Sequence, residues 1–359
     1  MNTLGRILRL TTFGESHGPM VGGVLEGVPA GLVLDMDLIQ AEVNRRKSVH
    51  VFTTPRQEPD KIELVSGVFE GKSTGAPIAL LVHNHNIKSK DYDNLKQSFR
   101  PGHADFTTFA KYGLRDHRGG GRSSARESVI RVGAGAIAKL LLQELGLEVV
   151  GGVFSIGGIG AKVIDFDFAR QSVIFSLSPE MEAQQKQAIL EAKQRGDSLG
   201  GVVLVQARAH ANLLGLGQPL YDKLDARIAG VMMGLNGVKG VFIGDPLVSS
   251  MQGSGYNDPL SPQGFKSNHS GGVLGGLGSG SDLVVWVHFK PTSSISTKQE
   301  SINTQGQAVH LELKGRHDPC IAIRGSVVCE SLLALILADF LLLNLGSQLG
   351  TLKGFYGKA

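Results

Sequence analysis

Apolar residues follow two different periods along the chain. Residues 4–13 alternate between apolar and polar, and the apolar runs at residues 20–27 and 283–289 also have the length and bounding residues of strands. Helical spacing instead follows residue 127 as far as Gly146 and appears again over residues 219–233. The pattern therefore predicts several strands and several amphipathic helices in one chain.

The segment at residues 119–127 combines the start of a helix with unusual chemistry. Ser124 and Glu127 have the spacing of a capping box, three glycines precede them, and Arg122 and Arg126 lie beside them. A helix start exposes backbone N–H groups and the positive end of the helix dipole. The segment therefore predicts an anion site, and the alternative is an ordinary capped helix with two solvated arginines.

Two histidines lie in glycine-containing loops. His17 is enclosed by Gly14 and Gly18 between two predicted strands, and His103 lies in the segment 100–105, which begins with an arginine. Histidine has the side chain whose ordinary pKa is nearest neutrality, so both are acid–base candidates. The alternative for His17 is a turn histidine that bonds to its own backbone.

Three further segments have charged or hydroxyl residues near predicted helix or strand ends. Asp37 is expected to cap a helix through Val43 that ends in basic residues 44–47, which suit either a helix C-terminus or a phosphate clamp. Residues 290–294, a lysine followed by proline and three hydroxyl residues, suit a phosphate grip or a polar turn. Asp318 is expected to cap the last long helix, with Pro319 in its first position. This repeat of a glycine, an arginine and a helix start hints at an internal duplication.

Composition limits the class of protein. The 359 residues are 42% hydrophobic and 19% charged, enough for a large core in one large or two smaller domains. The net charge of +4 favours anionic partners. Cys320 and Cys329 do not form a CxxC pair and the histidines lack metal-ligand spacing, so no metal site is expected.

The sequence also bears on location and mobility. Residues 1–9 lack the apolar core of a secretory signal, and the apolar run at 332–345 is interrupted by Asp339 and is too short to span a bilayer. We therefore expect a buried helix there, a cytoplasmic protein and no membrane partner. Two long polar stretches, residues 84–121 and 251–272, are expected to be mobile loops that close over a ligand. The glycine run at 275–280 precedes a strand and so lacks the context of a dinucleotide fingerprint.

Four long motifs together resemble the chorismate synthase family. They are residues 14–18, 100–105, 121–127 and 316–319, in family order, and the similarity covers nearly the whole chain. The resemblance implies an α+β fold, a single-domain β-α-β sandwich over residues 1–359, usually assembled as a homotetramer. It also implies the conversion of 5-enolpyruvylshikimate 3-phosphate to chorismate and phosphate, an anti 1,4-elimination that ends the shikimate pathway. Reduced FMN is required without net redox change, because the flavin lends an electron transiently.

The resemblance also assigns roles to single residues. His17 matches the group that protonates the departing phosphate, His103 the group near flavin N1, and Asp318 the group near flavin N5 that helps N5 take the ring proton. Substrate anions would be bound by four arginines: Arg46, Arg100, Arg126 and Arg316. Flavin contacts would come from Arg122, Ser123, Ser124, Asn236, Gly237, Gly275, Lys290, Pro291, Thr292, Ser293, Ser294 and the shared Arg316.

The sequence departs from the family pattern at two places, and it leaves the source of reduced flavin open. Many relatives have a second arginine several residues after Arg46, whereas this chain has a loop one residue shorter without it. Two alternatives stay open: Lys47 or His50 compensates, or the substrate carboxylate is held more loosely. Gly237 stands where alanine is common. No additional reductase domain is visible, so an external flavin reductase is expected, and NADPH would be needed only if the chain reduces its own flavin.

Two other function classes are alternatives to this lyase. A basic protein that binds RNA or DNA would need stacking aromatics beside a stripe of cations, but aromatics are only 6% and the arginines lie singly in loops. We therefore expect no nucleic-acid partner. A flavin oxidoreductase would instead show steady NADPH consumption coupled to substrate reduction.

Overall fold

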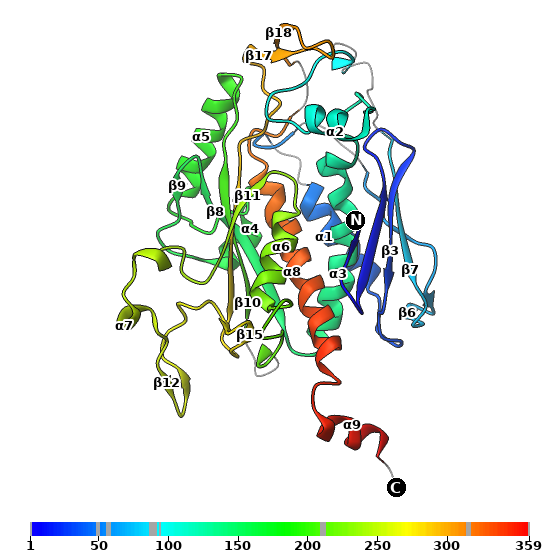
Figure 1. The fold of residues 1–359 in the computed structure, drawn as a ribbon, viewed down its shortest axis with the longest axis vertical. Helices are drawn as coiled ribbons and strands as arrows, with labels where there is room; N and C mark the ends of the chain where they lie inside the picture. Colours follow the sequence, from blue (N-terminus) through cyan, green and yellow to red (C-terminus); the bar gives the residue numbers. More distant parts are fainter. Residues whose placement is uncertain are drawn as a thin grey trace.

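Two antiparallel sheets enclose a layer of helices (Figure 1). The computed structural model describes residues 2–47, 51–54, 59–85, 92, 95–208, 213–313 and 317–357. The first sheet has the order β1 (Thr3–Leu4), β2 (Arg9–Gly14), β3 (Met20–Glu26), β7 (Ile78–His83) and β4 (Glu63–Leu64). The second has the order β9 (Ile159–Gly160), β8 (Glu148–Ile156), β10 (Gly201–Arg208), β16 (Leu283–Phe289) and β11 (Val238–Ile243). This arrangement confirms the predicted α+β fold.

Four helices lie between the sheets: α1 (Met36–Lys47), α3 (Ser128–Glu144), α6 (Leu224–Met233) and α8 (Ala322–Asn344) (Figure 1). Alternate residues of β16, such as Val285 and Val287, are fully buried against this layer, which is why this strand was readable from its pattern. Helices α3 and α8 approach closely, because a Cβ at Gly135 would lie 2.4 Å from the Cβ of Ser331. One continuous hydrophobic core thus joins both sheets through the helices.

Helix α8 is the most apolar element of the described chain. Its 23 residues are long and apolar enough to cross a membrane, but 83% of its most apolar window is buried inside the protein. The predicted buried helix is therefore confirmed, although it begins ten residues earlier than the apolar run suggested. Asp339 is tolerated there because its carboxylate accepts backbone hydrogen bonds from Arg6, Ile7 and Leu8, the last at 2.9 Å.

The two sheets share a connectivity. Matching β2 with β8, β3 with β10, β7 with β16 and β4 with β11 preserves every neighbour relation among these strands. In sequence, α1 lies between β3 and β4 as α6 lies between β10 and β11, and the long helices α3 and α8 follow β7 and β16. This correspondence supports the predicted internal duplication.

The remaining elements lie around this sandwich. Helix α4 packs on the outer face of the second sheet, where Phe166 and Ala169 contact Leu204 and Trp286. Helix α2 and the β17–β18 hairpin lie at one end of the molecule and helix α9 projects from the other (Figure 1). Their bounds are α2 (Asp105–Tyr112), α4 (Phe166–Gln171), α5 (Glu182–Gln194), α7 (Gly253–Tyr256), α9 (Leu349–Tyr356), β5 (Val68–Phe69), β6 (Lys72–Ser73), β12 (Leu260–Ser261), β13 (Gly264–Phe265), β14 (Val273–Leu274), β15 (Leu277–Gly278), β17 (Gln299–Ile302) and β18 (Ala308–Leu311).

Several predicted boundaries were wrong, for local reasons. The strand expected over residues 4–13 is two paired strands, since Gly5 turns the chain with a φ of 88°. Asp35, not Asp37, caps α1, by accepting from the N–H groups of residues 37 and 38 at 3.0 Å. The long loops contain structure, because residues 84–121 include α2 and residues 251–272 include α7 and the β12–β13 hairpin.

Two predicted helix caps also differ. Ser124 accepts from the N–H of Arg126, but this caps a 3-10 turn over Ala125–Glu127, and α3 begins only at Ser128. Glu127 turns away from Ser124 to accept from the Thr12 hydroxyl and to pair with Arg131 at 2.8 Å. Asp318 precedes α8 by four residues and does not cap it, because its carboxylate accepts from the N–H of Thr54.

Candidate functional site

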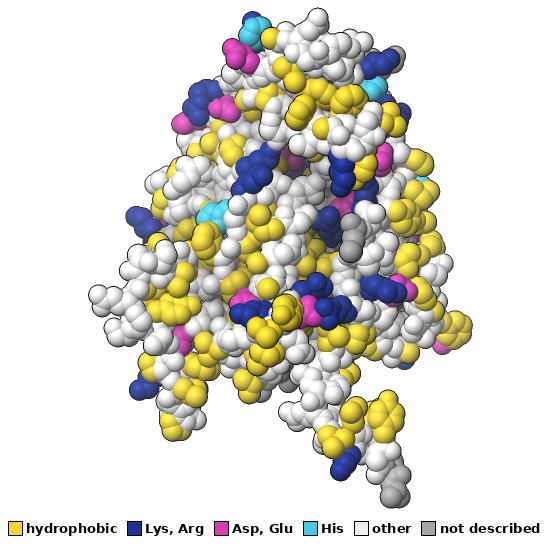
Figure 2. Space-filling view, viewed as in Figure 1, with side chains coloured by type: hydrophobic (Ala, Val, Ile, Leu, Met, Phe, Trp, Pro, Cys, Tyr) yellow, Lys and Arg dark blue, Asp and Glu magenta, His cyan; other side chains and the backbone are white. Residues whose placement is uncertain are grey.

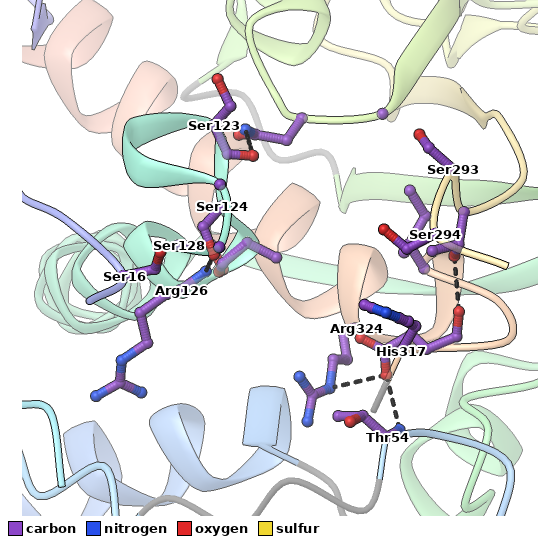
Figure 3. A pocket seen from close by; sticks show the side chains of 18 of the residues that line it. Ser16, Thr54, Ser123, Ser124, Arg126, Ser128, Ser293, Ser294, His317 and Arg324 are labelled. Atoms are coloured by element: carbon purple, nitrogen blue, oxygen red, sulfur yellow. Dashed lines mark hydrogen bonds and ion pairs between the residues drawn. The ribbon is translucent and has the colours of Figure 1, made fainter. Parts of the chain in front are cut away.

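A cavity of about 450 Å³ lies where the helix layer meets the surrounding loops. Ser123 and Ser124 lie on one side of it and Ser293 and Ser294 on the other (Figure 3). Its described lining includes six Lys and Arg residues but only two carboxylates, Asp60 and Asp318. The site therefore has an excess of positive charge, which suits an anionic ligand. The six cations are Arg46, Lys47, Arg100, Arg126, Lys290 and Arg324.

Arg46 and Arg126 share one buried carboxylate. Arg46, in the last turn of α1, donates from Nη2 to Asp60 Oδ2 at 2.7 Å, and Arg126 donates from Nη1 to the other oxygen. Arg126 is also fixed by Asn84 Oδ1 at 2.7 Å and by the carbonyl of His83 at 3.1 Å. Burial would raise the pKa of Asp60, but attraction by both arginines holds it below its usual value. Asp60 is therefore an ionised bridge between two predicted substrate-binding arginines.

A third arginine lies beside this pair. Arg324, in the first turn of α8, donates from Nη2 to the carbonyl of Lys47 at 2.9 Å, and its Nε lies 3.5 Å from Asp318 Oδ1 (Figure 3). Burial lowers the pKa of Arg46 to about 10, and repulsion by Arg324 and Arg126 contributes. Arg46 remains charged at neutral pH, because even this value is far above 7.

Asp105 organises a second group of cations. Its carboxylate accepts from Arg100 Nε at 2.7 Å and from Arg100 Nη2 at 2.8 Å, and lies 3.0 Å from His103 Nδ1. Burial would raise the pKa of Asp105, but hydrogen bonds from Arg100 and His103 hold it well below its usual range. An ionised carboxylate can only accept, so His103 carries a proton on Nδ1 and leaves Nε2 for other partners.

His17 is held in a confined position by its surroundings. Its side chain is buried and its ring meets the ring of Tyr92 edge to face, with centroids 5.2 Å apart. Gly119 leaves space for it, because a Cβ there would lie 2.8 Å from His17 Nε2 and 3.0 Å from Ser16 Oγ. His17 and Ser16 both line the cavity, as expected for a histidine presented by the turn between β2 and β3.

His317 is an uncharged histidine among cations. Burial lowers its pKa to about 4, and repulsion by Arg100 adds to the effect while Asp318 opposes it. Beside it, Thr292 donates to the carbonyl of Asp318 at 2.7 Å (Figure 3). Lys290 and Ser293 both donate to the carbonyl of Gly102, which ties residues 290–294 to the segment that carries His103.

The cavity also has an apolar side, and some buried polar atoms of its lining residues lack hydrogen-bond partners. Leu235, Phe289, Ile321 and Val328 contribute side chains to its lining. Gly237, with a φ of 85°, gives Ile321 room. Asn236 is fixed by donating to the carbonyl of Ser123 at 2.7 Å. Within the described residues, the buried Ser16 Oγ and the Nε atoms of Arg46 and Arg324 have no hydrogen-bond partner. The lining therefore suits a ligand that has both an apolar part and anionic groups.

The structure gathers most, but not all, of the predicted site residues. Of the predicted site residues that the structure describes, all line the cavity except Arg122 and Gly275. Arg316, and His50 in the loop after Arg46, lie outside the described residues. Arg122 points to the first sheet, where it donates to Thr12 Oγ1 at 2.9 Å. Gly275 lies in the turn of the β14–β15 hairpin. Neither position, in this single chain, reaches the cavity.

The lining residues that sequence reasoning missed include Arg324, His317 and Asp60. Arg324 had a readable signal, because it is the single Lys or Arg between residues 317 and 352, within a strongly apolar helix. His317 lies inside the motif at residues 316–319, but the family resemblance implied no role for it. Asp60 had no signal, because its backbone φ of 47° and its two arginine partners depend on the folded chain.

Other candidate chemistries find little support. Among the described residues, no cluster of three or more His, Cys, Asp or Glu side chains could hold a metal ion. Cys320 and Cys329 are both buried and free, and burial raises the pKa of the Cys320 thiol to about 12. Both are therefore unreactive thiols at neutral pH.

Comparisons with known proteins agree with the site. The family model of chorismate synthase matches residues 8–342. A chorismate synthase of Helicobacter pylori strain J99 is 60% identical over the full length of both chains. One from Sulfurovum is 56% identical over 99% of this chain and 100% of the relative. A crystal structure of a chorismate synthase has a TM-score of 0.76 and 31% identity, covering 98% of this chain and 97% of that one. The chain therefore belongs to the chorismate synthase family.

Proposed function

We propose that this chain converts 5-enolpyruvylshikimate 3-phosphate to chorismate and phosphate by an anti 1,4-elimination, the last step of the shikimate pathway. Family membership supports the reaction, and the observation that carries it is the field of arginines that converges on one cavity with histidines and a carboxylate. Such an arrangement can bind a phosphorylated acid and also move protons, as this elimination requires.

The arginines are proposed to hold the substrate's anionic groups. Arg46, Arg100 and Arg126 have fixed guanidinium positions because each is bonded to a buried carboxylate, and Arg324 joins them. A preorganised donor set stabilises negative charge that develops on the leaving phosphate, because its groups need not reorganise during the reaction. Arg316 belongs to the same proposal, although it lies outside the described residues.

Proton transfer is assigned to three groups. His17 would protonate the departing phosphate, since it is buried in the cavity wall beside Ser16. His103 would present Nε2 toward the ligands, because Asp105 occupies its Nδ1 side. Asp318 would help remove the ring proton, and its carboxylate is held by the N–H of Thr54 at 2.9 Å. Positioned acids and bases of this kind each contribute roughly 10²- to 10⁴-fold to a rate.

Reduced FMN is proposed as the cofactor, and when bound it would supply a transiently shared electron without net redox change. Ser123, Ser124, Asn236, Gly237 and residues 290–294 would hold it, and the apolar side chains near Phe289 would cover its ring. Arg122 and Gly275 belong to the same set by resemblance. An external reductase is the proposed source of reduced flavin, with NADPH used directly only if the chain reduces its own.

The proposed setting is a cytoplasmic homotetramer that acts on a small molecule, with no nucleic-acid or membrane partner. Single arginines held by buried carboxylates support small-molecule binding over nucleic-acid binding, which uses exposed cation stripes and stacking aromatics. A net flavin oxidoreductase would consume NADPH steadily in the presence of substrate.

An anaerobic assay tests the proposal. Purified protein, chemically reduced FMN and 5-enolpyruvylshikimate 3-phosphate are mixed, and chorismate and phosphate are followed together with the flavin spectrum. We expect both products in equal amounts with the flavin still reduced at the end. Product formation that consumes reduced flavin in proportion would instead indicate an oxidoreductase.

A further inference from the structure

The buried carboxylate of Asp60 lies between two arginines of the site. Its side chain is 1% exposed and each of its oxygens accepts from a different guanidinium, Arg46 on one side and Arg126 on the other. These arginines come from separate elements, the end of α1 and the segment before α3. Asp60 therefore joins two arginines that lie 80 positions apart in the sequence. Their distance in space is set by the folded structure and not by the chain between them.

The backbone of Asp60 is itself fixed. Its φ of 47° is in the left-handed region, which non-glycine residues seldom adopt and which persists only where the surroundings enforce it. Gln40 supplies that constraint from α1, because its Nε2 donates to the carbonyl of Asp60 at 3.0 Å and its Oε1 accepts from the N–H of Ile62 at 3.1 Å. Helix α1 thus anchors both Arg46 and the carboxylate that orients it.

Charge explains why a bridge is needed. Arg46, Arg126 and Arg324 are close enough that the other two lower the pKa of Arg46. Like charges at such a separation repel, so their spacing is stable only with a counter-charge between them. Asp60 and Asp318 together offset two of these three positive charges, which still leaves the group attractive to anions. Arg46 Nε is buried and has no hydrogen-bond partner among the described residues, so Asp60 does not engage every donor of this guanidinium.

We propose that Asp60 is a positioning residue whose carboxylate sets the spacing of Arg46 and Arg126 and so selects a substrate with several separated anionic groups over a simple phosphate ion. The identity of the substrate in this inference rests on the proposed function, whereas the geometry of the bridge does not. A single phosphate can bind to arginines at any spacing, but a rigid ligand with separated anionic groups needs one particular spacing.

Two substitutions separate charge from spacing. Asp60→Asn keeps the shape and suits the left-handed backbone, because asparagine tolerates positive φ, but it removes the charge. Asp60→Glu keeps the charge and lengthens the side chain by one methylene. Asp116→Asn is the matched control, since it also breaks an arginine–aspartate pair, with Arg118 at 2.8 Å, but does not line the cavity.

The measurement is a ratio of affinities. Calorimetry on the protein loaded with oxidised FMN gives dissociation constants for inorganic phosphate and for 5-enolpyruvylshikimate 3-phosphate, and steady-state assays with reduced FMN give kcat/KM. For both Asp60 variants we expect kcat/KM to fall about 10²-fold, as misplacement of a binding group by an ångström can cause. Substrate affinity should fall with it, while phosphate affinity stays constant or rises in Asp60→Asn. Asp116→Asn should leave the ratio unchanged.

Three outcomes would overturn the inference. Unchanged kcat/KM in Asp60→Asn would show that the bridge is dispensable, and tighter substrate binding would show that Asp60 only competes with the ligand. Equal losses of phosphate and substrate affinity, with a lowered Tm, would indicate a structural role alone. A wild-type protein that binds the substrate yet forms no product would refute the proposed reaction while leaving the affinity ratio measurable.

Discussion

At the scale of single residues, the position of His17 depends on the missing side chain at Gly119. A Cβ there would lie 2.7 Å from His17 Cδ2, closer than such atoms come, so Gly119→Ala must displace the histidine. We expect turnover to fall by about 10²-fold, the lower range for a positioned general acid, with flavin affinity retained. Steady-state kinetics and flavin titration measure both.

Gly146→Ala is the control for this substitution. Gly146 has a similar positive φ of 68°, but nothing lies within 4 Å of its added Cβ. Both variants carry the backbone cost of about 1–2 kcal/mol for a side chain in the left-handed region. Normal turnover in Gly119→Ala would contradict the assignment of His17, and impaired turnover in Gly146→Ala would show that strain alone is responsible.

His317 predicts a specific pH dependence of stability. The unfolded chain binds its proton with a pKa near 6.5, whereas the folded chain does so only near 4. Between these values the unfolded state binds more protons, so stability rises with pH across this window, by up to about 3 kcal/mol. His317→Gln should flatten this rise in urea unfolding measured from pH 4 to 6.5, and an unchanged slope would mean that other groups cause it.

At this scale, the residues whose gathering could be predicted are those with local chemistry. His17, His103 and residues 290–294 lie in glycine-flanked or polar segments, and the structure brings them to one cavity. Asp60 could not be predicted, because its role depends on partners 14 and 66 positions away. Arg122 was expected to face the ligand, but a residue's direction in a 3-10 turn is decided by neighbours such as Thr12.

At the scale of elements, a closed ring of four charges joins three central helices. Lys139 of α3 lies 2.7 Å from both Glu42 of α1 and Glu330 of α8, and Arg45 of α1 pairs with the same two carboxylates, at 2.8 Å and 3.0 Å. Burial would raise the pKa of Glu42, but Lys139 and Arg45 lower it to about 2. Each of these helices, or the turn that precedes it, supplies one arginine to the cavity.

Removal of one ring member should be costly. Lys139→Met leaves a buried and a largely buried carboxylate with one cation, and we expect the free energy of unfolding to fall by about 3–5 kcal/mol. Adding Glu330→Gln restores the balance between Arg45 and Glu42, so the double variant should recover most of this loss. Urea unfolding of the three proteins tests the ring, and additive losses in the double variant would contradict it.

Hydrophobic periodicity predicted an element well where one of its faces is buried and the elements beside it are regularly paired. Strand β16 matches residues 283–289 because its alternate residues face the helix layer between two paired strands. Helix boundaries were less predictable, since α8 begins at Ala322 without a side-chain cap and Arg324 in its first turn bonds to the distant carbonyl of Lys47. The ring of charges joins positions up to 285 residues apart, which a pattern along the chain does not report.

At the scale of the whole molecule, helix α9 has no buried residue and projects with exposed apolar side chains (Figure 2). Phe355 and Tyr356 are 76% and 78% exposed. Exposed apolar groups of this kind are typical of surfaces that are covered in an assembly. We expect the protein in solution to have four times the chain mass of 38.1 kDa, measured by sedimentation equilibrium.

The C-terminal helix itself can be tested in the same experiment. Phe355→Ser with Tyr356→Ser should shift the equilibrium to smaller species, because it removes apolar area that a second copy would cover. Lys353→Ser, on the same helix, should not. A monomeric wild-type protein would contradict the proposed tetramer, and an unaffected tetramer in the double variant would place the contacts elsewhere.

The central claim is that one cavity holds both the flavin and the phosphorylated substrate. A crystal structure of the protein with oxidised FMN and 5-enolpyruvylshikimate 3-phosphate tests it most directly. We predict both ligands within the cavity, with substrate anions on Arg46, Arg100 and Arg126 and the flavin beside Asn236 and residues 290–294. Ligands bound outside this cavity, or a substrate that contacts none of these arginines, would contradict the account.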